Sequence, residues 1–375
     1  MKSTLLSFLM LFVLFSCNKD EEIQTAEAEF AVSGKFLAPN DTDPIPNAKV
    51  SAYVNNELIN QTLTDAEGKF TIHLNRGDFH LVLNKGKFKT EKDITVEGDM
   101  TLENYKIETF PNIGVVTGSF DNIESVLYSI GLFNPVTGDP LFDIIEGNAF
   151  TRMANTGHKH ELHGSHQANR TQNNPLLNPN TSFHFGDLMA DPALLASYDI
   201  IFLNCGLNES LESNSSVLTD YVNNGGILYA TDWASGYLED ITNSGANYIT
   251  PLDPEKSGNS LTTTATILDG TLSDWLLLNF GISVDDTVLI DEFLPAWQVV
   301  DSYDSATTIS WLSGEVNYDD ATNTAVTATK DLAFTFIHGN GAVLYSSFHT
   351  ENNEADFSDV DRIMEFLVFE MSDIE

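Results

Sequence analysis

The larger part of this 375-residue chain is organised around one stretch, residues 225–234, which reads Gly-Gly-Ile-Leu-Tyr-Ala-Thr-Asp-Trp-Ala. The two glycines end a helical pattern, and the apolar run after them is typical of a buried strand. Asp232 follows that run, with Ala230 two positions before it and Ala234 two positions after it. A sharp turn from a strand into a helix needs small residues at those two positions, because bulk there would clash. The stretch therefore predicts a strand with Asp232 at its carboxyl end.

Strands and helices alternate on both sides of this stretch. Four more short apolar runs predict strands, at 113–117, 142–145, 198–203 and 342–348. Helical spacing of apolar residues predicts helices at 123–130 and 217–222, and a final helix capped by Ser358 with Ile363, Phe366, Leu367 and Met371 on its apolar face. This alternation predicts a parallel sheet covered by helices on both faces. Strand-like runs between about 250 and 335 predict an inserted or edge β-layer.

Residues 29–108 show a different pattern, which predicts a small all-β unit. Apolar residues alternate along four runs, at 30–36, 49–54, 70–74 and 79–83. The order of the motifs Val32-Ser33-Gly34, Pro46-Asn47-Ala48 and Gly68-Lys69-Phe70 resembles the carboxypeptidase regulatory-like domain, a transthyretin-like β-sandwich. That resemblance implies a spacer or binding module without catalytic residues.

The N-terminus indicates export. Lys2 precedes an apolar run at 5–15, and Leu14-Phe15-Ser16-Cys17 follows. The run of about 11 residues is too short to cross a bilayer core of about 30 Å as a helix. The segment resembles the bacterial lipobox, which implies a signal peptide at 1–16, lipid on Cys17 and a tether at 17–28. Residues 18–22, Asn-Lys-Asp-Glu-Glu, resemble an acidic export tag, so we expect an outer-membrane lipoprotein on the cell surface, with a periplasm-facing anchor as the alternative.

Charge and cysteine content restrict the possible partners. The chain has 55 Asp and Glu against 17 Lys and Arg, a formal net charge of −38. Such a polyanion is repelled by phosphates, which excludes nucleic acid as a partner.

Cys17 and Cys205 are the only cysteines. If Cys17 carries lipid, Cys205 has no partner within the chain, and the cores must be stable without disulfides.

A second informative motif closes the last predicted strand, at Phe348-His349-Thr350-Glu351. A histidine followed two positions later by a glutamate can present an imidazole and an orienting carboxylate. Sites in open parallel sheets lie at the carboxyl ends of the strands, where Asp232 is also expected. Residues 112–375 thus resemble the class I glutamine amidotransferase-like fold, a flavodoxin-like parallel sheet, and within it the ThuA-like branch.

The resemblance has one departure with chemical consequences. In amidotransferases a cysteine nucleophile stands where this chain has Asp232, and a terminal "FHPE" motif supplies the His and Glu matched by His349 and Glu351. A carboxylate attacking an amide would form an anhydride and expel a poor leaving group, so glutaminase activity is not expected. The strand end Asn204-Cys205-Gly206 leaves two interpretations of Cys205, a residue facing the same cleft or a small buried apolar residue. By the resemblance, Gly206 fits the turn that supplies an oxyanion-hole N–H.

Two functions stay open. The first is a non-catalytic binding or accessory protein, linked to carbohydrate use by the ThuA-like resemblance, with a carbohydrate or a cell-surface protein as partner. The second is a hydrolase of a sugar-like substrate, with Asp232 as nucleophile and His349, oriented by Glu351, as base. Four tryptophans can stack on sugars or pack in the core: Trp233, Trp275, Trp297 and Trp311.

A histidine cluster offers a candidate metal site. Four of the nine histidines lie within residues 157–167: His158, His160, His163 and His166. Imidazoles at this spacing can converge on Zn²⁺, Cu²⁺ or Ni²⁺, whereas the alternative is a polar loop. No cofactor is required by either function, and a divalent metal at these histidines is a candidate.

Overall fold

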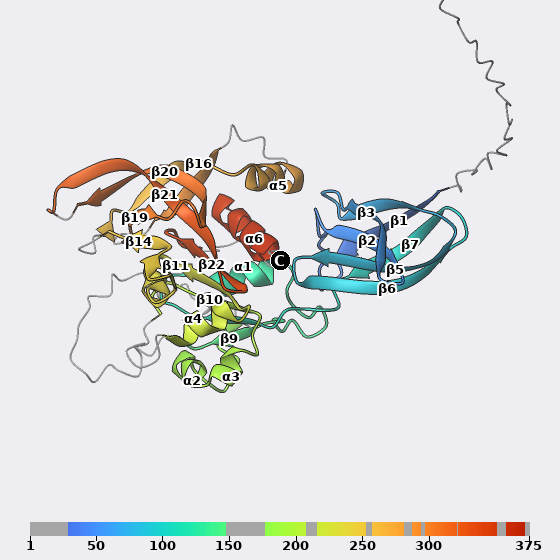
Figure 1. Ribbon diagram of the computed structural model, residues 1–375, viewed down its shortest axis with the longest axis horizontal. Helices are drawn as coiled ribbons and strands as arrows, with labels where there is room; N and C mark the ends of the chain where they lie inside the picture. Colours follow the sequence, from blue (N-terminus) through green and yellow to red (C-terminus); the bar gives the residue numbers. More distant parts are fainter. Residues whose placement is uncertain are drawn as a thin grey trace, which may run out of the picture.

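The computed structural model describes residues 29–147, 177–207, 216–252, 257–280, 287–293, 297–320, 322–350 and 358–371. They form a β-sandwich and a larger α/β unit (Figure 1). In this described part of the chain, no helix has the length and apolarity needed to cross a membrane.

The sandwich consists of two small sheets. In one, β1 (Phe30–Leu37) pairs antiparallel with β4 (Lys69–Leu74) and parallel with β7 (Met100–Lys106). The other has the order β3 (Glu57–Leu63), β2 (Lys49–Val54), β5 (Gly77–Lys85) and β6 (Phe88–Val96). The small all-β sandwich predicted from the sequence is confirmed, and β3, β6 and β7 are additions to the four predicted strands.

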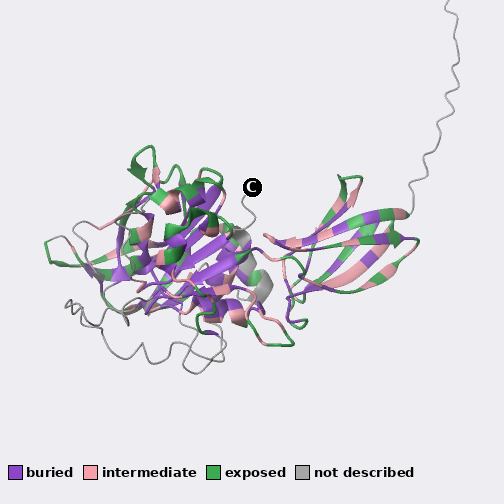
Figure 2. Ribbon diagram, turned by 90° about the horizontal axis from the view of Figure 1, so that it is seen from below, coloured by how far each residue is buried: buried purple, intermediate pink, exposed green. Residues whose placement is uncertain are grey.

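The sandwich core follows the alternation in the sequence. Along β4, Phe70, Ile72 and Leu74 are buried while the residues between them are exposed, and β5 buries Phe79, Leu81 and Leu83 in the same way. Figure 2 shows buried and more exposed residues alternating along these strands. Side chains in a strand point to opposite faces in turn, so the alternate apolar residues meet between the two sheets.

The α/β unit is built on five parallel strands. Their order across the sheet is β9 (Asp143–Ile145), β8 (Ile113–Val116), β10 (Ile200–Leu203), β11 (Ile227–Thr231) and β22 (Gly341–Ser346). Numbered by their sequence order, these strands read 2-1-3-4-5, which is the flavodoxin-like order. The predicted fold class is therefore confirmed.

Antiparallel strands lengthen this sheet beyond β22. They follow in the order β21 (Ala325–His338), β20 (Thr308–Asp319), β16 (Leu261–Ile267) and β17 (Thr287–Phe293). Short pairs flank them: β12 (Thr242–Asn243) with β13 (Ala246–Asn247), β14 (Ile249–Pro251) with β19 (Val300–Tyr303), and β15 (Ser257–Gly258) with β18 (Trp297–Gln298). The β-layer expected at 250–335 is thus mostly a continuation of the main sheet. Short connections join β20 to β21 and β21 to β22, and short connections join antiparallel neighbours only, so the whole sheet is mixed.

Helices cover both faces of the sheet, as predicted. On β10, Ile200 and Phe202 belong to one hydrophobic cluster and Ile201 and Leu203 to a second. The first cluster includes residues of α1 (Ile123–Ser129), α5 (Gly270–Phe280) and α6 (Asp359–Met371). The second includes residues of α2 (Phe185–Ala190), α3 (Pro192–Leu195) and α4 (Ser216–Asn223). The sheet is therefore the middle of three layers.

Helix α6 begins with the predicted cap. The Ser358 hydroxyl accepts the backbone N–H of Asp361 at 3.1 Å, and the Asp361 carboxylate accepts the N–H of Ser358 at 3.0 Å. These reciprocal bonds satisfy backbone donors that a helix start leaves free. The predicted apolar residues Ile363, Phe366 and Leu367 are buried.

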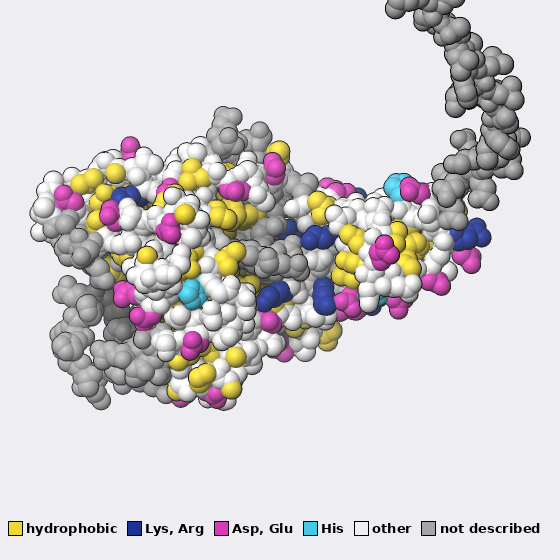
Figure 3. All heavy atoms as spheres, in the orientation of Figure 1, with side chains coloured by type: hydrophobic (Ala, Val, Ile, Leu, Met, Phe, Trp, Pro, Cys, Tyr) yellow, Lys and Arg dark blue, Asp and Glu magenta, His cyan; other side chains and the backbone are white. Residues whose placement is uncertain are grey.

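The sandwich and the α/β unit pack against each other. The rings of Phe88 in β6 and Phe369 in α6 lie 5.1 Å apart at 65°, an edge-to-face arrangement. Lys87 forms an ion pair with Asp199 at 3.7 Å. Figure 3 shows acidic side chains scattered over the visible face, whereas most of the visible Lys and Arg side chains lie on the sandwich and at its junction with the α/β unit.

Candidate functional site

Asp232 occupies a sharp turn at the carboxyl end of β11. The strand ends at Thr231, and Asp232 begins a 3₁₀ helix, η4 (Asp232–Leu238), where the sequence predicts a turn from a strand into a helix. The backbone of Asp232 has φ of +46°, a left-handed conformation that is uncommon for a residue with a side chain. Strained backbone of this kind gathers at functional sites. The sequence spacing around Asp232 thus predicted a tight turn, and the turn is present.

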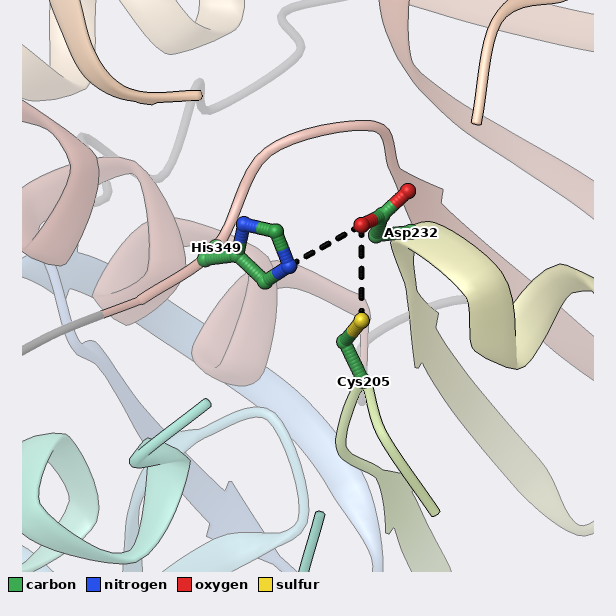
Figure 4. A group of neighbouring side chains, drawn as sticks. All are labelled: Cys205, Asp232 and His349. Atoms are coloured by element: carbon green, nitrogen blue, oxygen red, sulfur yellow. Dashed lines mark hydrogen bonds and ion pairs between the residues drawn. The ribbon is translucent and has the colours of Figure 1, made fainter. Parts of the chain in front are cut away.

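Three side chains from three neighbouring strand ends meet here (Figure 4). His349 Nε2, after β22, forms an ion pair with Asp232 Oδ2 at 3.0 Å. The Cys205 thiol, after β10, donates to the same oxygen at 3.3 Å. The backbone N–H of Gln298 donates to the other oxygen, Oδ1. None of the three side chains is more than 2% exposed. The sequence left two interpretations of Cys205, a residue facing the cleft or a small buried residue. Both apply, because Cys205 is buried and its thiol faces Asp232.

Burial and neighbouring charges set the protonation of this cluster. Burial by itself would lower the pKa of His349, but Cys205 and the carboxylates of Asp232 and Asp121 outweigh it, and the pKa of the imidazole is well above its usual value. Burial, with a contribution from the charge of Asp232, raises the pKa of the Cys205 thiol to about 12. The Cys205 thiol therefore stays protonated at neutral pH, and the raised pKa of His349 favours the imidazolium beside Asp232 Oδ2.

Asp121 is a site residue that the sequence analysis missed. Its Oδ1 accepts the N–H of Thr350 at 2.7 Å, and its Oδ2 accepts the N–H of Cys205 at 2.8 Å and the hydroxyl of Thr231. One carboxylate thus ties together the carboxyl ends of β10, β11 and β22. Asp121 is 2% exposed, and this burial raises the pKa of its carboxyl group. The sequence showed only that Asp121 comes after strand β8, whose carboxyl end lies at the same edge, and did not show the path of the loop between them.

Glycine permits the close approach of two loops at this edge. Gly206 has φ of +80°, and a Cβ there would lie 2.7 Å from the backbone nitrogen of Ser119. The loops after β8 and β10 therefore meet where no side chain would fit. The oxyanion-hole role that the family resemblance implies for Gly206 stays a prediction.

The tryptophans differ in exposure. Trp297 and Trp311 are 1% and 8% exposed, and each ring N–H donates a hydrogen bond, to Asn259 O and to Thr335 Oγ1. They are core residues. Trp233, beside Asp232, is 37% exposed. The side chain of Trp275 is outside the described part of the structure. Trp233 is thus the candidate among the described tryptophans for contact with a ligand.

Several predicted site residues lie outside the described residues. They are Cys17, Glu351 and the loop histidines His158, His160, His163 and His166. The lipid anchor, the third member of the predicted triad and the histidine metal site therefore stay predictions.

No known family model matches the chain, and no curated protein does. Among solved structures, 5-hydroxyisourate hydrolase from Klebsiella pneumoniae is 19% identical over 21% of this chain and 89% of its own, with a TM-score of 0.18. A DUF3823 family protein from Bacteroides ovatus is 15% identical over 22% of this chain and 46% of its own, with a TM-score of 0.19. A protein described as ThuA-like from Parabacteroides merdae is 11% identical over 63% of this chain and 78% of its own, with a TM-score of 0.33. Similarity at this level carries no argument about activity.

Proposed function

We propose that this protein is an exported, membrane-anchored accessory protein that binds its ligand without chemical turnover. One observation carries the proposed absence of turnover: the carboxylate of Asp232 is buried, and both of its oxygens are engaged. Oδ1 accepts the N–H of Gln298, while Oδ2 accepts the Cys205 thiol and pairs with His349. A nucleophilic carboxylate needs a free lone pair directed at a substrate, whereas groups of the protein itself face three of the ~four acceptor positions of this one.

The neighbouring thiol offers no replacement nucleophile. The thiolate is the reactive form of cysteine, and the pKa of Cys205 is raised to about 12, so the thiol stays protonated at neutral pH. The Cys205 thiol also donates a hydrogen bond to Asp232, which stabilises the protonated form of the thiol further. The cluster therefore lacks the reactive thiolate of an acyl-transfer site, and its hydrogen bonds hold neighbouring strand ends together.

A carbohydrate is the ligand class that we assign. The ThuA-like resemblance motivates it as an analogy of fold. Trp233 adds a residue-level argument, because a 37% exposed indole presents a flat apolar surface to solvent beside the cluster. Indole rings combine an apolar body with an N–H donor, which suits the alternation of C–H and O–H groups on a sugar.

The anchor is tested separately from the binding. We expect metabolic labelling with a palmitate analogue to modify the wild-type chain, and a Cys17→Ser variant to stay unlabelled. Protease added to intact cells distinguishes the surface-exposed form from the periplasm-facing alternative. An unlabelled wild-type chain contradicts the lipid anchor and leaves the binding proposal intact.

The binding function is tested on the detergent-solubilised full chain. We expect it to retain at least one glycan class on an array and to release no product from glutamine, aryl glycosides or the retained glycan. Trp233→Ala is expected to weaken retention, and Trp311→Phe, in the core, is the matched control. Failure to retain any glycan contradicts the assignment of the ligand class.

A second candidate function has one specific observation in its favour. Asp232 combines a φ of +46° with an ion pair to His349 at 3.0 Å, a strained residue beside a potential base. A hydrolase using Asp232 and His349, with Glu351, would form an ester on Asp232 during turnover of a sugar-like substrate. A substrate-derived mass on an Asp232-containing peptide, lost in Asp232→Asn, would favour the hydrolase over the accessory protein.

A further inference from the structure

Three side chains with different metal-binding atoms converge at the carboxyl edge of the sheet. Cys205 offers a sulfur, Asp232 an oxygen and His349 a nitrogen, and the three atoms all lie within 4.8 Å of one another. We propose that these side chains together bind one divalent transition-metal ion, with Zn²⁺ as the preferred ion. None of its proposed ligands is a loop histidine, and the inference holds whether or not the protein binds glycans.

The distances fit a tetrahedral ion after small adjustments. Asp232 Oδ2 lies 3.3 Å from Cys205 Sγ and 3.0 Å from His349 Nε2. With Zn–S of about 2.3 Å and Zn–N or Zn–O of about 2.0–2.1 Å, two ligand atoms of a tetrahedral site are roughly 3.3–3.6 Å apart. These two distances are within a few tenths of an ångström of that range. Cys205 Sγ and His349 Nε2 lie within 4.8 Å of each other, so side-chain movement is needed to admit the ion.

The three ligands are held in place by the backbone around them. Asp121 accepts the N–H of Cys205 and the N–H of Thr350, the residue after His349. The N–H of Gln298 fixes Oδ1 of Asp232 and leaves Oδ2 directed at the other two ligands. The ligands follow β10, β11 and β22, which are adjacent strands of one sheet. Metal sites depend on such supporting bonds for ligand orientation and affinity.

Charge balance allows the exchange of the ion for protons. If the metal-free cluster holds a thiol, a carboxylate and an imidazolium, its net charge is zero. Binding of the ion displaces the thiol proton of Cys205 and the Nε2 proton of His349, and both protons pass to solvent. The product is a thiolate, a carboxylate, a neutral imidazole and a divalent ion, again with a net charge of zero. The buried site therefore gains no uncompensated charge on loading.

The ligand types determine which ion is preferred. Mg²⁺ and Ca²⁺ take oxygen ligands, whereas a set of thiolate, imidazole and carboxylate suits Zn²⁺. Within the described ranges, no other His, Cys, Asp or Glu joins the group. Three protein ligands leave the fourth position of the tetrahedron for a water molecule.

Cobalt reports the proposed ligands directly. The full chain is prepared with all four loop histidines changed to Gln, stripped with a chelator and loaded with Co²⁺, both as folded protein and during refolding. We expect the near-ultraviolet absorption of a Co²⁺–thiolate bond and the visible bands of tetrahedral Co²⁺. Back-titration with Zn²⁺ should abolish both and leave one Zn²⁺ per chain by elemental analysis.

Variants assign the signal to the cluster. Cys205→Ser is expected to abolish the thiolate band, and His349→Gln to lower Zn²⁺ affinity at least ~10-fold, since loss of even a supporting residue costs that much. His80→Gln is the matched control, because His80 lies beside Asp93 and Glu91 on the exposed surface of the sandwich. It is expected to leave Zn²⁺ uptake unchanged.

Three results would overturn the proposal. They are an absent thiolate band under both loading conditions, Zn²⁺ uptake that disappears with the loop histidines, and full Zn²⁺ uptake by Cys205→Ser. Where a variant does not fold, as judged by circular dichroism, the parent protein decides: a rise in its melting temperature with added Zn²⁺, together with the thiolate band, supports the site. None of these measurements uses a glycan, so they fail or succeed independently of the proposed function.

Discussion

The carboxylate of Asp232 lies 3.0 Å from the imidazole of His349, although the whole antiparallel extension of the sheet separates the two residues in the sequence. Parallel pairing of β11 with β22 explains this, because Thr231 is opposite Ser346 and both strands end at the same edge. The residues that follow each strand are therefore brought together by the sheet itself.

Asp121→Asn is expected to destabilise the protein. The amide keeps one acceptor but turns an N–H donor toward a backbone N–H, so a buried bond is lost and a donor is left without an acceptor. We expect the free energy of unfolding to fall by about 2–3 kcal/mol, measured by urea denaturation. Asp93→Asn is the control, because Asp93 is 90% exposed. An equal loss in both variants would contradict the role of Asp121.

The contact between Phe88 and Phe369 couples the two units. Both rings are buried, so Phe88→Ala is expected to lower the free energy of unfolding by about 3–5 kcal/mol. A double-mutant cycle with Phe369→Ala should give a coupling energy of about 0.5–1.5 kcal/mol for the edge-to-face pair. Additive effects in chemical denaturation would show that the rings do not interact.

Stability is expected to depend on pH through Glu365 in α6. Burial raises the pKa of Glu365 to about 7, with Lys85 opposing the rise and Asp43 adding to it. Since the folded state holds this proton more tightly than the unfolded chain, the stabilisation is complete below about pH 4.5 and is lost as the pH rises through about 7. The side chain retains some exposure, so we expect a change of about 1–2 kcal/mol.

Glu365→Gln isolates this dependence. The amide does not titrate, so the difference in unfolding free energy between variant and parent should grow from pH 5 to pH 8, in favour of the variant. Glu97→Gln in the sandwich is a control for general charge removal. A pH profile that Glu365→Gln leaves unchanged would assign the dependence to other groups.

The cap of α6 provides a local test of the fold. Ser358→Ala removes the hydroxyl that accepts the N–H of Asp361. We expect a loss of about 1 kcal/mol in the free energy of unfolding, as is usual for an N-cap serine. Ser358→Asp should retain most of the stability, because a carboxylate also caps a helix start. Equal stability of all three proteins would show that the cap contributes nothing.

Local sequence pattern predicted the elements that are buried on one or both sides. Strands β10 and β11 are buried on both sides and therefore consist of apolar runs. Strands β4 and β5 are buried on one side and therefore alternate. Both patterns were recognisable in the sequence. Strand β3 was missed because it lies at the edge of its sheet, with Leu58 and Ile59 exposed, so no alternation marks it. The antiparallel extension was recognised only as a β-layer, because pairing partners are set by tertiary contacts.

The candidate site was partly predictable for the same reason. Asp232 and His349 stand directly after recognisable strands, so their shared edge followed from the fold. Asp121 lies in a loop whose path depends on Gly206 and on the close approach of two turns, which no local pattern reports. Gln298 contacts Asp232 through its backbone N–H. Almost any residue type has a backbone N–H, so the sequence could not predict this contact.

Strand β22 has a further consequence, which concerns the order of assembly. It lies between β11 and β21 in the sheet but follows both in the sequence. Until it is inserted, those two strands present unpaired edges that invite association with other chains. The last strand to become available thus completes the middle of the sheet, and the chain stays prone to aggregation until that moment.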